Sequence, residues 1–161
     1  MFSHKTTTSI KNFRFLFIAL LMMATGSSYA CSDTEYLDMV NSEIGQIGSV
    51  PRTEAYRISN FARKLSNISS HCAMNAQSDK SRQKMLKIKI YADSLERNAD
   101  DLSRAVNKSM GNLGKMYQKE NDGLETMALL FSTVNARSAG EAAEAAMLED
   151  EKHISDILEN W

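Results

Sequence analysis

Apolar residues recur every three or four positions over most of this chain, which is the period of an amphipathic α-helix. The longest stripe predicts a helix over about 80–109, or to Tyr117 if the helix continues across Gly111 and Gly114. A stripe of this length requires a partner helix of similar length to cover it. Its positions are Met85, Ile88, Ala92, Leu95, Ala99, Leu102 and Val106, and Leu113 rejoins it after Ser109.

Two shorter stripes upstream predict a helical hairpin. The first helix is expected to begin at Ser32, because Ser32 and Glu35 have the spacing of a capping box. A turn at 49–51 follows, and Pro51 suits the first position of the next helix, where a missing N–H is no loss. The apolar positions are Leu37, Val40, Ile44 and Ile47 in the first helix, and Ala55, Ile58, Phe61, Leu65, Ile68 and Cys72 in the second.

The last part of the chain, 124–158, continues the helical pattern. Its segment 127–131 is apolar on nearly every side, and Ser138 with Glu141 has the spacing of another capping box. The segment is therefore either two helices broken at Gly140 or one bent helix. No convincing alternating strand pattern is present, so the predicted fold is all-α, an up-down bundle of four to five helices after a cleaved signal peptide.

Residues 1–30 have the organisation of a secretory signal peptide. A basic stretch without acidic residues precedes an apolar run over 15–24, and the small side chains of Ser28 and Ala30 suit cleavage before Cys31. As a helix this run would span about 15 Å, against roughly 30 Å of bilayer hydrocarbon. We therefore expect no permanent transmembrane segment and a single mature domain over 31–161. The alternative is an uncleaved segment that tethers the protein to a membrane.

The mature chain contains two cysteines, Cys31 and Cys72, and an even number in an exported protein favours a disulfide. If the first two helices pack antiparallel across their short turn, the start of one lies beside the end of the other, which brings the two residues together. Two alternatives stay open. In the first, both thiols are free. In the second, Cys31 carries a lipid, as in bacterial lipoproteins, although Ser28 and Tyr29 match the lipoprotein signal poorly.

Charge is divided unevenly along the mature chain. The segment 31–79 carries a net −2, the segment 80–119 a net +6 and the segment 120–161 a net −8, which leaves the mature form near −4. This division predicts that the basic helix packs antiparallel against the acidic segment. It does not favour a nucleic-acid surface, because export removes ordinary access to nucleic acid.

The sequence contains no motif of hydrolytic, metal-dependent or nucleotide-binding proteins. His71 and His153 are the histidines of the mature chain, whereas a zinc site needs about four converging ligands. Haem held between methionine and histidine is not favoured either, since methionines on an apolar stripe are usually core residues and Cys-x-x-Cys-His is missing. We therefore predict no catalytic, metal-binding or cofactor-binding residue.

A well-patterned scaffold without a reactive site is typical of a protein that binds other proteins. We expect a non-enzymatic protein of the bacterial periplasm with a protein partner in the cell envelope. Such a protein is a component of a secretion or conjugation machine, or an immunity or chaperone-type protein. The alternative is a periplasmic carrier of a small ligand, haem or metal. The candidate partner surface combines Met127, Leu130 and Phe131 with the acidic Glu149 and Asp150.

Overall fold

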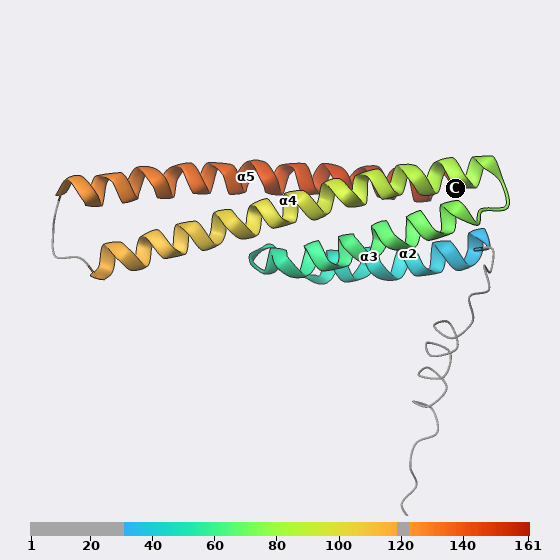
Figure 1. The fold of residues 1–161 in the computed structure, drawn as a ribbon, viewed down its shortest axis with the longest axis horizontal. Helices are drawn as coiled ribbons and strands as arrows, with labels where there is room; N and C mark the ends of the chain where they lie inside the picture. Colours follow the sequence, from blue (N-terminus) through green and yellow to red (C-terminus); the bar gives the residue numbers. More distant parts are fainter. Residues whose placement is uncertain (1–30, 119–122) are drawn as a thin grey trace, which may run out of the picture.

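The residues that the structure describes, 31–118 and 123–161 of a computed structural model, form four α-helices and one short 3₁₀ helix (Figure 1). In chain order these are α2 (Asp33–Ser49), η1 (Arg52–Glu54), α3 (Ala55–Met74), α4 (Asp79–Gln118) and α5 (Gly123–Glu159). Successive helices run up and down, which confirms the predicted all-α up-down bundle. The predicted signal peptide lies outside the described residues, and its cleavage stays a prediction.

The N-terminal hairpin forms much as its pattern predicts. The Ser32 Oγ accepts a hydrogen bond from the backbone N–H of Glu35 at 3.2 Å, and the Glu35 carboxylate accepts one from the backbone N–H of Ser32 at 3.1 Å. This capping box starts α2, and its hydrogen bonds to Ser32 lower the pKa of Glu35. Pro51 was predicted to open the second helix, but it precedes η1, and α3 begins only at Ala55.

In the second hairpin, the structure has the longer of the alternatives that the sequence left open for each helix. α4 continues through Gly111 and Gly114 to Gln118, and α5 is one helix rather than two. A Cβ atom placed on Gly140 would lie 3.4 Å from the Cβ of Ala105, so this glycine marks a close approach of α4 and α5, not a helix break. With 40 residues, α4 is about 60 Å long.

Because α2 and α3 are much shorter than α4 and α5, the molecule has two parts (Figure 1). In the part that we call the base, all four helices pack together around buried apolar side chains. In the part that we call the arm, residues 103–118 of α4 and 123–140 of α5 extend beyond the turn between α2 and α3. An ion pair of Arg52 with Glu151, whose two hydrogen bonds are 2.7 and 3.0 Å long, fastens that turn to α5.

The basic α4 and the acidic α5 pack antiparallel. Two of the side-chain contacts between them are a hydrogen bond from an amide and a stack of two rings. The Asn98 amide donates to the Asp150 carboxylate at 2.8 Å, and the Tyr91 ring stacks on the His153 ring at a centroid distance of 4.6 Å. Ion pairs instead join other elements, as Arg63 of α3 does with Glu96 of α4 at 2.7 Å. Among the described residues, apolar and amide contacts therefore contribute to the packing of α4 against α5.

Candidate interaction surface

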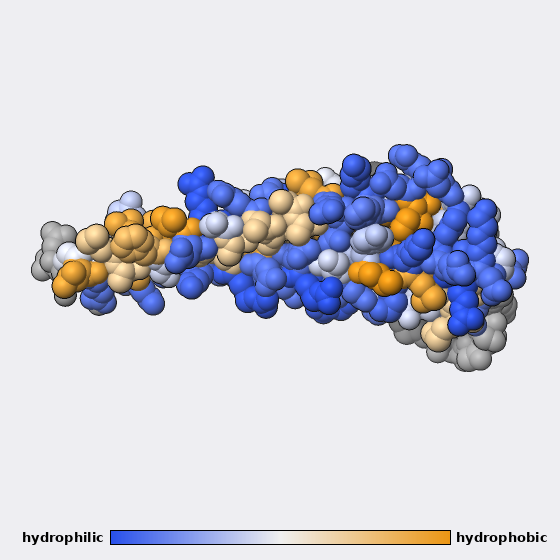
Figure 2. Space-filling model, turned by 90° about the horizontal axis from the view of Figure 1, so that it is seen from above, coloured by the Kyte–Doolittle hydropathy of each residue, from blue (hydrophilic) through white to orange (hydrophobic). Residues whose placement is uncertain are grey.

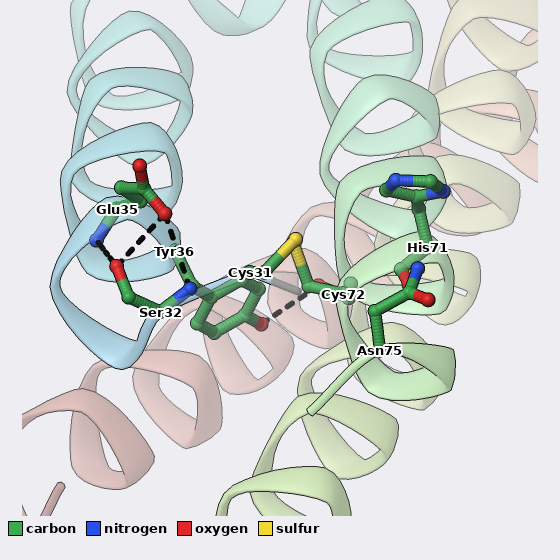
Figure 3. Close-up of a disulfide and its surroundings, with 8 residues drawn as sticks. Cys31, Ser32, Glu35, Tyr36, His71, Cys72 and Asn75 are labelled. Carbon is green, nitrogen blue, oxygen red and sulfur yellow. Dashed lines mark hydrogen bonds between the residues drawn. A yellow bond between two sulfur atoms is a disulfide. The ribbon is translucent and has the colours of Figure 1, made fainter. Parts of the chain in front are cut away.

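The end of the base that lies away from the arm is closed by a disulfide (Figure 3). Cys31 precedes α2 and Cys72 lies near the end of α3, with their Cα atoms 5.2 Å apart, so the structure confirms that the hairpin brings the two cysteines together. A sulfur bonded in this disulfide cannot also carry a thioether-linked lipid. The lipoprotein alternative for Cys31 is thus incompatible with this pairing.

Beside the disulfide, Tyr36 of α2 is completely buried. Its hydroxyl and the Ser69 hydroxyl are hydrogen-bonded at 2.8 Å, and its ring lies 5.2 Å from the ring of Trp161, measured between centroids. Burial raises the pKa of Tyr36 to about 12, although the hydrogen bond with Ser69 acts in the opposite direction. This end of the molecule is therefore a tightly packed structural region with its polar atoms satisfied.

The side chains that are buried between α4 and α5 differ between the base and the arm. In the base they include large apolar side chains such as Leu95, Met147 and Ile154, each 0% exposed. Among the described residues of the arm, the buried positions hold only small or polar side chains. The Asn112 amide there donates to the Ser132 hydroxyl at 3.0 Å. The buried residues of the arm are Ala105, Asn112, Ala136 and Gly140.

Most large apolar side chains of the arm lie instead on its outside, although Met116 and Leu129 are half-buried. On α4, the stripe that α3 covers in the base continues past the turn between α2 and α3 with the same spacing. Leu95 on this stripe is completely buried, whereas Leu113 is 45% exposed and Tyr117 is 92% exposed. The apolar spacing of α4 is the same in both parts, but only the base has a neighbouring helix, α3, that covers the stripe.

The face of α5 that points away from α4 is also apolar within the arm. Figure 2 shows this side of the molecule, with apolar surface along the narrow arm and a mostly polar surface over the base. The apolar stripe is formed by Leu124, Met127, Phe131 and Val134, of which each is more than half exposed. Their spacing of three, four and three residues is that of a helix–helix contact seam.

Of the five residues of the predicted partner surface, four are exposed and one is buried. Met127, Leu130 and Phe131 are exposed on α5, and Glu149 is exposed further along the same helix. Asp150 does not belong to this surface. It lies on the seam with α4, is 7% exposed and accepts the hydrogen bond from Asn98, so a partner cannot reach it.

The comparisons with known proteins return nothing. No family model matches this chain, and no curated protein or solved structure is similar to it. An account of the function therefore depends on the surface of the molecule itself.

Two further observations concern other kinds of site. Of the helices in the described part of the chain, none is long and apolar enough to cross a membrane. Within the same residues, no three His, Cys, Asp or Glu side chains gather into a group that would hold a metal ion. The imidazole ring of His153 stacks on the Tyr91 ring, and its Nε2 atom lies 3.7 Å from the Glu149 carboxylate.

The sequence interpretation found the α5 residues but not the α4 stripe of the arm. That stripe comprises Met110, Leu113 and Tyr117 together with the half-buried Val106. A signal was present, because a stripe that continues to Tyr117 is about twice as long as the longer of the two stripes upstream. A helix of that length cannot be covered from end to end by such a hairpin, so part of it had to be exposed.

Proposed function

We propose that this chain is a non-enzymatic helical protein of the bacterial cell envelope that binds a protein partner through its arm. The observation that carries the proposal is the continuation of the α4 core stripe beyond the turn between α2 and α3. In the base the stripe is covered by α3, whereas in the arm Met110, Leu113 and Tyr117 stand between 45% and 92% exposed. Monomeric proteins rarely expose a contiguous apolar patch of this kind without a binding role.

The occupant that fits this stripe is an amphipathic helix of the partner. The stripe extends an existing helix–helix interface, so a helix that abuts the turn between α2 and α3 would continue the bundle along α4. By helical periodicity, Lys108 and Lys115 lie on the opposite side of α4, and the positions beside the stripe are uncharged. Binding would therefore depend on apolar contacts and respond weakly to salt.

Two features support the proposed envelope location. The predicted signal peptide would export the chain, and the cysteine pair at disulfide distance suits an oxidising compartment such as the periplasm. The function would then be that of a structural component of a secretion or conjugation machine, or of an immunity or chaperone-type protein. The arm suits each of these roles, because all of them require one protein to hold another.

The test is site-specific photocrosslinking in the native host, with the photoreactive residue at Leu113. Ile90 is the matched control, because it lies on the base of the same helix, on the opposite side, and is 62% exposed. A partner captured from position 113 is then purified and titrated with the mature protein. We expect stoichiometric binding, an adduct that maps to an amphipathic helix, and affinity that is nearly constant between low and high salt.

Substitutions complete the test. Leu113→Glu is expected to weaken the interaction at least about tenfold, since it places a charge on an apolar contact, whereas Ile90→Glu leaves it unchanged. Equal capture from positions 113 and 90, or binding that survives Leu113→Glu, would contradict the proposal. Circular dichroism of both variants establishes that each remains folded.

A further inference from the structure

The geometry points to a second interface: we infer that the outer face of α5 pairs antiparallel with the same face of a second copy, forming a homodimer. This face lies on the side of α5 that faces away from α4, and the α4 stripe lies on another side of the arm. The inference is thus independent of the partner proposed above, and both surfaces can be occupied at once.

The outer face of α5 is complementary to itself in shape. By helical periodicity its first half presents Phe131 and Val134, and its second half presents Ala142 and Ala145 along the same line. All four are exposed. A two-fold axis that passes near Ser138 would place Phe131 opposite Ala145 of the second copy and Val134 opposite its Ala142. At these two pairs of positions a large side chain would meet a small one, which is how helices pack closely. Further from the axis, the same register places Met127 opposite Glu149 and Leu124 opposite Lys152.

The charged edge of this face fits the same arrangement. In the single copy, Arg137 Nε and the Glu141 carboxylate form an exposed ion pair at 2.9 Å. Both residues lie on one edge of the outer face, on either side of Ser138. In an antiparallel helix pair, equivalent edges lie next to each other, so Arg137 would meet Glu141 of the second copy, and Glu141 would meet its Arg137. A parallel pair would not bring these opposite charges together.

The available area is adequate for a specific dimer. Leu124, Met127, Leu130, Phe131 and Val134 are between 49% and 82% exposed, which amounts to on the order of 500 Å² of apolar surface per copy. The alanines and the charged edge extend this surface toward the roughly 800 Å² per partner that stable interfaces bury. A membrane is a poorer occupant, because membrane-surface helices carry many lysines and arginines, whereas the segment 120–161 carries a net −8.

The test is analytical ultracentrifugation of the oxidised mature protein, 31–161, from about 1 to 100 µM. A monomer–dimer equilibrium is expected, and Phe131→Glu is expected to shift it to monomer throughout this range. Leu113→Glu is the control, since it changes the α4 stripe and leaves the outer face of α5 intact. A protein that stays monomeric at the highest concentration overturns the inference, as does a dimer that Leu113→Glu disrupts and Phe131→Glu does not.

Two further variants test the antiparallel register. Ser138→Cys, near the proposed axis, is expected to yield a disulfide-linked dimer under mild oxidation, whereas Asn107→Cys, exposed on α4, is not. Arg137→Glu is expected to weaken the dimer, and the exchange Arg137→Glu/Glu141→Arg to restore it. A dimer that Ser138→Cys does not cross-link, or that the charge exchange does not restore, overturns the antiparallel arrangement. Because Leu113→Glu is expected to weaken partner binding but not the dimer, the two proposals can fail separately.

Discussion

The helices α4 and α5 run through both the base and the arm, but the two parts distribute their side chains in opposite ways. In the base, large apolar residues such as Leu95 and Met147 are completely buried, and the surface is mostly polar, with separate exposed apolar residues such as Ile90. In the arm, the buried seam contains Asn112 and small residues, while Phe131 and Tyr117 are exposed to solvent. The contrast shows that an apolar stripe specifies a helix, whereas burial of that stripe requires a neighbour of matching length.

The contrast also separates stability from function. The base has a disulfide, a continuous apolar core and a buried tyrosine with a satisfied hydroxyl, all of which stabilise one arrangement. In the arm, the fully buried residues are small or polar and the large apolar Met116 and Leu129 are only half-buried, so we expect the continuation of α4 and α5 from the base to contribute much of its stability. If this division holds, changes in the base affect folding and changes on the arm affect binding.

Reduction of the Cys31–Cys72 disulfide should have the largest effect on the base. In the chain-entropy account, a cross-link between residues separated by 41 positions contributes up to about 4 kcal/mol to the free energy of unfolding. Urea unfolding of oxidised and reduced protein, monitored by circular dichroism, measures this difference without a substitution. Equal midpoints would show that the disulfide does not stabilise the base.

Two leucines on the same stripe of α4 provide the most direct comparison of base and arm. Leu95→Ala removes a completely buried side chain and should lower the free energy of unfolding by about 2–5 kcal/mol. Leu113→Ala, at a half-exposed position, should cost less than about 1 kcal/mol. Both are measured by urea unfolding of the mature protein. Similar losses for the two variants would mean that the arm has a core of its own.

Much of the base was predictable because its signals are local. The spacing of Ser32 and Glu35 located the start of α2, and the short turn at Pro51 required an antiparallel hairpin, which placed Cys31 near Cys72. The stripe of α4 was equally clear. These features depend on helical periodicity and on chain connectivity, and a single sequence contains both.

Two residues could not be assigned from the sequence, since the role of each is decided by another helix. Gly140 left open whether 124–158 is one helix or two, and the structure places it where α4 comes close, in contact with Ala105. Asp150 resembled a surface carboxylate, but the Asn98 amide compensates its burial. No local pattern around position 140 or 150 indicates the neighbour, so periodicity alone could not assign either residue.

Alkaline pH should weaken the base through Tyr36. Its pKa in the folded protein is raised to about 12, above its ordinary value of 10.0, because burial disfavours the phenolate. The resulting stability is fully present below pH 10 and is lost as the pH rises toward 12, by on the order of 2–3 kcal/mol. Urea midpoints of wild type and Tyr36→Phe between pH 9 and 12 measure this loss, which should be absent from the variant. Parallel decreases in both proteins would assign it to other groups.

The smallest expected effects distinguish the two polar contacts along the seam of α4 and α5. Asn98 donates to the buried carboxylate of Asp150 in the base, and Asn112 donates to the hydroxyl of Ser132 in the arm. Hydrogen bonds to charged groups contribute about 1.5–3 kcal/mol, and neutral ones about 0.5–1.5 kcal/mol. Double-mutant cycles with alanine at each pair should therefore give the larger coupling free energy for Asn98 and Asp150. A larger coupling in the arm would reverse the comparison, because it would make the polar seam, rather than the continuation of the helices from the base, the interaction that holds the arm together.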